Sequence, residues 1–245
     1  MLRVTGEELV ARYRKGERDF RKVDLTGADL QGRKLIGVDL SGAELSHADL
    51  QFADLTGADL TGAELAAAFL TKAVLGSAKL VRADLSEAHL GDAALIRADL
   101  TGADLREADL AGAKLVSAKL VRAGMVGAVL TRADLTEAVL EGADLSDARL
   151  DEARLERARL GGARLVGARL VSARAHRAVL ARADLQGATL RGARLVDADL
   201  SRALLEGADL SDADLTGADL CRTLMKGANL MGAMLTSTEM TYTEV

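Results

Sequence analysis

The 245-residue chain contains no proline and no tryptophan, and only 2% of its residues are aromatic. Proline lacks the N–H that a β-ladder needs, so its absence leaves uninterrupted strand pairing open to the whole chain. The scarcity of aromatic rings excludes a surface on which nucleic-acid bases stack. The net charge of −5 is small for this length and points to neither a strongly basic nor a strongly acidic protein.

Cysteine and long hydrophobic runs are also scarce. Cys221 is the single cysteine, so no internal disulfide can form, and we expect a reducing, cytoplasmic location. The N-terminus lacks the apolar segment of a secretion signal. The longest apolar run, residues 65–70, is far too short to cross a membrane, so we predict no membrane span.

Residues that could support catalysis do not cluster in the sequence. His47, His89 and His176 are far apart, and none has a cysteine or carboxylate at a spacing typical of metal ligands. No histidine lies near Cys221 to act as its base. We therefore predict no catalytic residues, no metal site and no cofactor, and we predict that the protein is not an enzyme.

The sequence repeats with a period of five residues. Leucine occupies every fifth position from Leu25 to Leu235, with three exceptions, and alanine precedes each of these centres by two residues from Ala28 to Ala233, again with three exceptions. The exceptions are Met125, Ala175 and Met225 among the leucines, and Arg33, Val38 and Thr223 among the alanines.

This period excludes both regular elements. Five residues turn an α-helix by about 500°, so successive leucines would wander around its surface. In a strand an odd period sends successive leucines to opposite faces. A chain that turns one corner per repeat can instead direct every leucine and alanine inward.

The repeated phrase, for example Ala-Asp-Leu-Thr-Gly at residues 98–102, resembles the pentapeptide-repeat family. The resemblance implies an all-β fold, a right-handed quadrilateral parallel β-helix with four repeats per coil. About eleven coils stacked at roughly 4.8 Å would make a rod about 50 Å long, with residues twenty apart directly above one another. We expect a cap and lead-in at 1–22, the solenoid at 23–238 and a tail at 239–245.

The lead-in is predicted to contain a helix that covers the first coil. Thr5 and Glu8 have the spacing of a capping box, which predicts a helix over residues 6–15. Phe20 is then the first inward centre. An open solenoid end exposes unpaired strand groups, and this helix would cover them. The stretch at 7–20 also resembles the head segment of pentapeptide-repeat proteins from photosynthetic bacteria.

Acidic residues that immediately precede leucine centres at intervals of twenty predict a stacked acidic column. The column comprises Asp24, Glu44, Glu64, Asp84 and Asp104. Such short side chains can bond to the local backbone at a corner. Alternatively the column imitates nucleic-acid phosphates, because some members of the resembled family bind DNA gyrase or related topoisomerases as acidic, dimeric rods. In this chain the run of acidic residues stops at Gly124, and the same position holds Arg164 two coils later.

The same position becomes arginine between residues 149 and 194. This basic collar comprises Arg149, Arg154, Arg159, Arg164, Arg169, Arg174 and Arg194. Consecutive repeats occupy consecutive faces, so these arginines should encircle the rod, and three of them should share one column. The collar is either a solvated surface or a docking surface for an acidic protein or another polyanion. Nothing in it fits sequence-specific reading of DNA.

The C-terminal coils carry apolar side chains in outward positions. Candidate self-association residues are Leu204, Leu224, Met231 and Met234. Exposed apolar side chains near a solenoid end can mediate association. We expect either a homodimer through this end or a tail that folds over the last coil.

Two functions remain open from the sequence. The first is a non-catalytic structural or interaction rod, a scaffold that presents a charge-patterned surface on a leucine and alanine core to a protein partner of unknown identity. The alternative is a DNA-mimicking modulator of DNA gyrase or a related topoisomerase.

Overall fold

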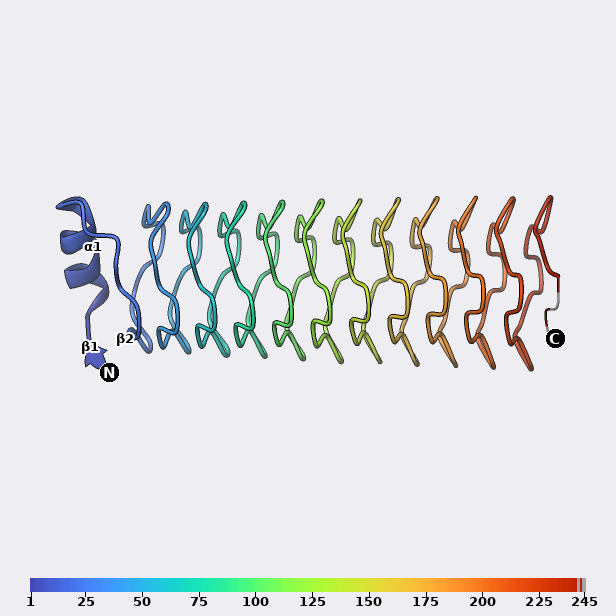
Figure 1. Ribbon diagram of the computed structural model, residues 1–245, viewed down its shortest axis with the longest axis horizontal. Coiled ribbons are helices and arrows are strands. Elements are labelled where there is room, and N and C mark those ends of the chain that lie inside the picture. The colour runs from blue at the N-terminus through green and yellow to red at the C-terminus, as the bar shows by residue number, and fades with distance from the viewer. Residues whose placement is uncertain (242, 244–245) are drawn as a thin grey trace.

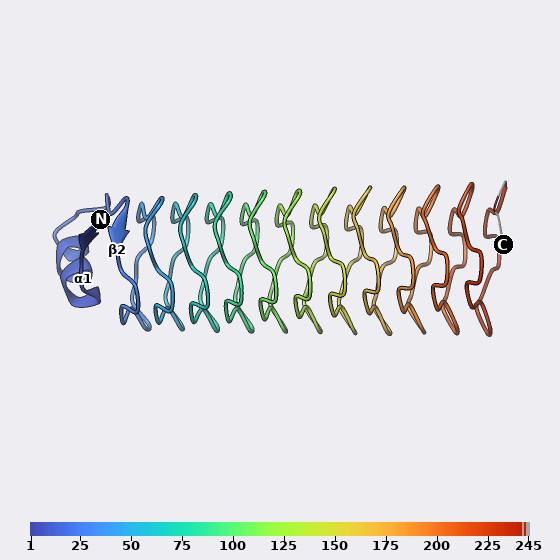
Figure 2. The ribbon, with the colours of Figure 1, turned by 90° about the horizontal axis from the view of Figure 1, so that it is seen from below.

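The computed structural model describes residues 1–241 and 243, and the chain forms an elongated rod of stacked coils with one helix at its N-terminal end (Figures 1 and 2). Strand β1 covers Leu2–Arg3, helix α1 covers Gly6–Arg14, and strand β2 covers Val23–Asp24. Strand β1 pairs in parallel with β2, with Leu2 opposite Val23. Beyond β2 the coils are joined by isolated parallel bridges.

The bridges join residues twenty apart. The column that runs from Asp19 to Glu239 makes eleven such steps. Asp99 bridges Lys119, and the Leu100 amide donates to the Lys119 carbonyl at 2.7 Å. Leucines 100 and 120 therefore occupy neighbouring coils of one column. The prediction of a right-handed quadrilateral β-helix is confirmed.

A tight turn after each leucine makes each corner. The amide of Ala103 donates to the Leu100 carbonyl at 3.0 Å, and the same bond recurs along the rod. The residue two positions after each leucine has a positive φ, as in Gly102 at 66° and Arg182 at 60°. This pattern is that of a turn whose third residue favours glycine. Bulkier residues are accepted there because the ladder fixes the backbone on both sides.

The leucine and alanine columns form one continuous core. The apolar exceptions to the pattern are also buried, and they are Val38, Met125, Ala175 and Met225. Thr223 replaces an alanine, and its Oγ1 donates to the Leu220 carbonyl at 2.8 Å, so its hydroxyl is satisfied inside the core. Arg33 is the exposed exception and lies beside the N-terminal cap.

Helix α1 begins where the capping signal predicts. Thr5 Oγ1 accepts the Glu8 amide at 3.1 Å, and Lys15 forms the C-cap, so the helix is one residue shorter than expected. The Glu8 carboxylate pairs with Arg12 at 3.6 Å. Leu9 is fully buried and joins the helix to the core.

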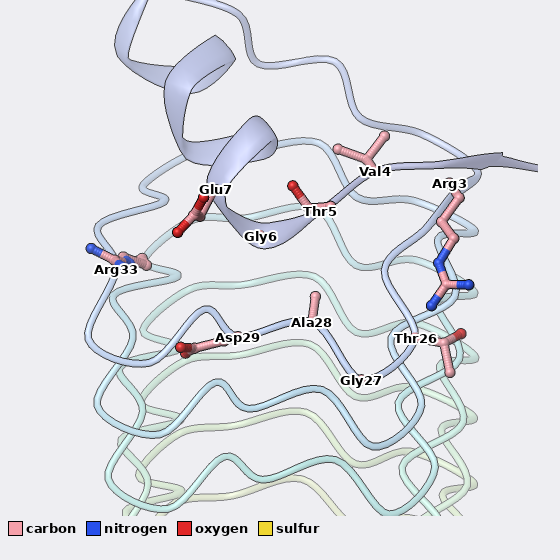
Figure 3. Close-up of a pocket in the computed structure, with 10 residues that line it drawn as sticks. All are labelled: Arg3, Val4, Thr5, Gly6, Glu7, Thr26, Gly27, Ala28, Asp29 and Arg33. Carbon is pink, nitrogen blue, oxygen red and sulfur yellow. The ribbon is translucent and has the colours of Figure 1, made fainter.

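The helix packs closely on the first coil. Figure 3 shows Gly6 over the turn that carries Asp29. A Cβ atom at Gly6 would lie 2.1 Å from the Asp29 carbonyl oxygen, so only glycine permits this approach.

Ladder bonds continue into the stretch expected to form the tail. Glu239 bridges Asp219, and the Arg222 amide donates to the Thr241 carbonyl at 2.9 Å. Residues 242, 244 and 245 of the expected tail lie outside the described residues.

Candidate interaction surface

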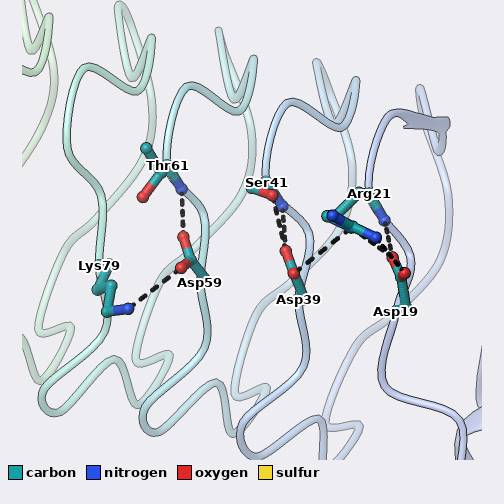
Figure 4. Close-up of polar contacts among 7 residues, drawn as sticks. All are labelled: Asp19, Arg21, Asp39, Ser41, Asp59, Thr61 and Lys79. Carbon is teal, nitrogen blue, oxygen red and sulfur yellow. Dashed lines mark hydrogen bonds and ion pairs between the residues drawn. The ribbon is translucent and has the colours of Figure 1, made fainter.

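The position immediately before each leucine, here called the flanking slot, faces outward. Every aspartate in this slot accepts the amide of the residue two positions further on. Figure 4 shows the Ser41 and Thr61 amides donating to Asp39 and Asp59, both at 3.0 Å. Asparagine does the same at Asn229. The short side chain thus completes the corner of its own repeat.

The predicted acidic column is stacked, because successive members bridge one another from residue 24 to residue 104. The aspartates of this column already accept hydrogen bonds from backbone amides of their own repeats. The Thr26 amide, followed by its hydroxyl, lowers the pKa of Asp24. The Arg106 side chain and amide both bond to Asp104, and the side-chain bond is the main cause of the lowered pKa of Asp104.

A second acidic column on another face was missed by sequence reasoning. Asp19, Asp39 and Asp59 are stacked there. Arg21 pairs with Asp19 at 2.6 Å and with Asp39 at 3.7 Å, and Lys79 pairs with Asp59 at 3.3 Å (Figure 4). Hydrogen bonds from the Arg21 side chain lower the pKa of Asp19 to about 2. The N-terminal coils therefore present mixed charge on this face.

All seven collar arginines are exposed. Arg149 bridges Arg169, and Arg174 bridges both Arg154 and Arg194. Three collar members have ion-pair partners, namely Arg154 with Asp134 at 3.2 Å, Arg159 with Glu141 at 2.7 Å and Arg169 with Asp151 at 3.3 Å. Among the described residues, no ion pair is formed by the remaining members, which are Arg149, Arg164, Arg174 and Arg194.

The collar divides the rod by charge. Residues 149–194 contain eleven arginines and four acidic residues, a net charge of +7, whereas the whole chain carries −5. The remainder of the chain therefore carries −12. The collar is a basic band between acidic segments, which gives it an attraction for anions that the net charge conceals.

Repeats with arginine in the flanking slot lack the corner carboxylate. The Ser201 amide donates to Asp199 at 2.9 Å, but the equivalent amides of His176 and Val196 have no protein acceptor within the part of the chain that the structure describes. These amides follow Arg174 and Arg194. Two shallow depressions lie at these arginines, and the second of them is also lined by His176 and Val196. One is lined by Glu152, Ser172, Arg174, Gly192 and Arg194, and the other by His176, Gly192, Arg194, Val196, Asp212, Asp214 and Met234.

The candidate self-association residues fall on different faces. Leu204 and Leu224 are stacked and half-buried, in the column that begins with Asp24. Met234 is 52% exposed and continues the column of Arg194, while Met231 is 74% exposed at the preceding corner. The structure therefore brings the two leucines together and places the methionines elsewhere on the last coil.

An exposed aromatic pair was also missed. Phe69 and His89 stack with ring centroids 5.1 Å apart, and Lys72 lies over the Phe52 ring at 6.0 Å. Phe52 and Phe69 are 54% and 40% exposed. The available signal was phenylalanine in a flanking slot that usually holds aspartate. These rings lie outside the collar.

One cluster could in principle ligate a cation. Asp219, Cys221 and Glu239 converge near the C-terminal end, with Cys221 Sγ 4.0 Å from Glu239 Oε2. Asp219 already accepts the Cys221 amide at 2.8 Å. Sequence reasoning missed the cluster because its members come from two coils. Exposed acidic groups of this kind are common without an ion, so we assign no site.

No helix in the described residues is long or apolar enough to cross a membrane.

The stacked, five-residue repeats define a pentapeptide β-solenoid. The family described as pentapeptide repeats matches this chain in overlapping segments from residue 24 to residue 244, and the chain belongs to that family. No curated protein matches it.

Several solved structures are similar. HetL, a pentapeptide-repeat protein involved in heterocyst differentiation regulation in the cyanobacterium Nostoc sp. strain PCC 7120, is 34% identical, with 96% of this chain and 94% of HetL covered and a TM-score of 0.47. A QnrB1 variant, a plasmid-mediated fluoroquinolone resistance protein, is 18% identical over 66% of this chain and 90% of its own, with a TM-score of 0.51. Rfr23 from the cyanobacterium Cyanothece 51142 is 33% identical over 37% and 58%, with a TM-score of 0.31.

Proposed function

We propose that the protein is a non-catalytic interaction rod that binds an acidic macromolecule on its arginine collar. The observation that carries this proposal is the concentration of a +7 charge in residues 149–194, where four exposed collar arginines have no ion-pair partner among the described residues. The convex, regular surface suits docking of a partner better than enclosure of a substrate.

The collar is difficult to explain as a stabilising feature. Arginine in the flanking slot gives up the corner bond that aspartate makes at Asp199. Stacked arginines such as Arg174 and Arg194 also repel each other, by about 0.9 kcal/mol per neighbouring pair in bulk water. Both effects oppose folding, so a role for the arginines in binding is the simpler account.

The test is the affinity of the full chain for poly-L-glutamate as a function of salt concentration. We expect binding that weakens steeply as salt rises, because exposed charges are screened beyond about 10 Å at 0.1 M salt. Replacing Arg149, Arg164, Arg174 and Arg194 by glutamine should abolish it. A matched control removes four other exposed cations, by substituting glutamine for Arg82, Arg97, Lys114 and Arg122. Salt-independent binding, or equal loss in both variants, would contradict the proposal.

The alternative function is mimicry of DNA by the acidic column, with DNA gyrase or a related topoisomerase as partner. Its support is the stacking of acidic residues from Asp24 to Asp104. The corner bond of Asp24 occupies one of its carboxylate oxygens, and the pairing of Arg106 with Asp104 offsets one negative charge of the column. The likeness to QnrB1, at 18% identity, concerns the fold alone. Inhibition of gyrase supercoiling by the purified protein would favour this alternative, and lack of any effect would remove it.

We also propose a homodimer through the C-terminal coils. Met231 and Met234 are 74% and 52% exposed there, and Leu235 is 38% exposed. Contiguous apolar exposure of this kind marks association sites. Light scattering should give twice the monomer mass, and substituting serine for Met231 and Met234 should restore the monomer. A monomer at high concentration would exclude the dimer.

A cytoplasmic location completes the proposal. Cys221 is a free, half-buried thiol and the sole cysteine. A protein without disulfides suits a reducing compartment. Cell fractionation that places the protein outside the cytoplasm would contradict it.

A further inference from the structure

We infer that the collar recognises carboxylate side chains of an acidic polypeptide through paired donors, each pair being one arginine and the backbone amide two residues after it. Among the described residues the pairs at Arg149, Arg164, Arg174 and Arg194 are open, and the inference concerns the two that are stacked in one column, Arg174 with the His176 amide and Arg194 with the Val196 amide. This inference rests on the proposed function and deepens it, because it states what the collar binds and by which atoms.

The rod itself contains the template for such a site. In the repeat that has Arg169 in its flanking slot, Asp151 from the adjacent coil supplies the missing carboxylate. Asp151 Oδ1 accepts the Val171 amide at 3.1 Å, and Asp151 Oδ2 accepts Arg169 Nε at 3.3 Å. A carboxylate from outside the repeat therefore fits between the arginine and the amide of an arginine repeat.

A second example shows a guanidinium and a backbone amide on one carboxylate, although here both donors belong to Arg106 itself. Asp104 accepts the Arg106 amide at 3.1 Å and Arg106 Nε at 2.9 Å. Charge-assisted bonds from a guanidinium are stronger than neutral ones, and the amide fixes the position of the carboxylate. The combination selects a planar, acidic acceptor.

The two inferred sites have no internal carboxylate to fill them. The residue equivalent to Asp151 is Glu156 for the Arg174 pair, and Glu156 instead pairs with Arg154 at 3.6 Å. For the Arg194 pair the equivalent residue is His176, which is not acidic. Within the described residues, neither amide has an acceptor and neither arginine has an ion pair.

The spacing of the sites favours a polypeptide ligand. Arg174 and Arg194 are bridge partners in adjacent coils, so the sites are about 4.8 Å apart. Acidic side chains three or four residues apart on a helix are separated by about 5–6 Å and could fill both. The collar also lacks interleaved aromatic rings, which single-stranded nucleic acids use for stacking.

The first experiment follows backbone amide signals of the ¹⁵N-labelled full chain during titration with poly-L-glutamate. We expect the His176 and Val196 signals to move. The Ser201 and Val171 amides, already bonded to Asp199 and Asp151, serve as internal controls and should stay in place. Binding without movement of His176 and Val196 would overturn the inference and leave the proposed function standing. Absence of binding at low salt would overturn both.

The second experiment compares two variants with the same change in charge. Arg174→Asp with Arg194→Asp supplies internal carboxylates to both amides, and should lower the affinity for poly-L-glutamate at least about tenfold. Arg182→Asp with Arg202→Asp places the same charges at corner positions and should lower it about threefold or less. Equal losses would show that charge alone attracts the ligand. Unchanged thermal unfolding of each variant confirms that it remains folded.

The third measurement separates carboxylates from phosphates. The wild-type chain should bind poly-L-glutamate more tightly than a thymidine oligonucleotide of equal charge at the same salt concentration. Equal or tighter binding of the oligonucleotide would overturn the assignment to carboxylates.

Discussion

The coils that carry Asp39 and Asp59 and the coils that carry Arg174 and Arg194 have the same backbone, the same core and the same ladder. They differ in what the flanking slot does. Each aspartate turns back to its own repeat and accepts an amide. The two arginines extend outward, and the amides of their repeats have no protein acceptor within the described chain.

The comparison separates the core residues, which determine the fold, from the flanking-slot residues, which determine the surface of the rod. Leucine and alanine fill the interior in both regions, so the fold tolerates either charge in the slot. Each aspartate adds a local bond, whereas Arg174 and Arg194 add outward charge and leave the amides of their repeats open. The residue in the flanking slot can therefore change the binding preference of the rod's surface at a small cost in stability.

The largest effect should come from breaking the core that both regions share. Deleting Thr131 shifts every later leucine out of its column, whereas Leu130→Ala removes one side chain and should cost about 2–5 kcal/mol. We expect the deletion to unfold the collar coils altogether, as measured by urea denaturation and circular dichroism. Equal destabilisation by the two changes would contradict the coil register.

The next largest effect concerns the cap. Gly6→Ala places a Cβ 2.1 Å from the Asp29 carbonyl oxygen, and such overpacking costs about 1–3 kcal/mol. Alanine is otherwise the better helix former, so a loss would isolate the clash. Gly76→Ala is the control, because a Cβ atom at Gly76 would lie 4.0 Å from its nearest neighbour, the Ile96 carbonyl oxygen. Equal melting temperatures for both variants would show that the helix does not pack as described.

The comparison of the slots can be tested directly. Asp199→Ala removes bonds to the Ser201 amide and hydroxyl, at 2.9 and 2.6 Å, and should cost about 0.5–1.5 kcal/mol. The Arg174 side chain forms no hydrogen bond or ion pair within the described residues, so Arg174→Ala should leave stability unchanged or slightly raised. Urea denaturation of both variants measures the difference. A larger loss for Arg174→Ala would reverse the roles assigned to the two slots.

Prediction from sequence succeeded where one periodic rule determines the structure. The leucine period and the resemblance it carries predicted the coil and the stacking of residues twenty apart, and the spacing of Thr5 and Glu8 predicted the start of helix α1. Sequence reasoning missed the contact of Asp151 with Arg169, because that contact depends on side-chain reach between coils. It also missed the Phe69–His89 stack, although the two residues are twenty apart in the flanking slot, because attention went to the charged residues of that slot.

The smallest effect should appear with pH. Hydrogen bonds from Arg21 hold the pKa of Asp19 at about 2, against an ordinary value of 3.8. Because the folded pKa is the lower one, the stabilisation is complete above about pH 4 and is lost as the pH falls towards 2. Asp19 is exposed, so solvent screening keeps the effect small. Melting temperatures measured between pH 5 and pH 2 should fall less for Asp19→Asn than for the wild-type chain, and identical slopes would contradict the assignment.

The most direct test of the central claim is a hydrogen–deuterium exchange footprint of the full chain with and without bound poly-L-glutamate. The account predicts slower exchange at amides within residues 149–196, with the largest change at His176 and Val196, and no change along the acidic column from Asp24 to Asp104. Protection centred on that acidic column, or no protection of the collar in a complex shown to form, would contradict it.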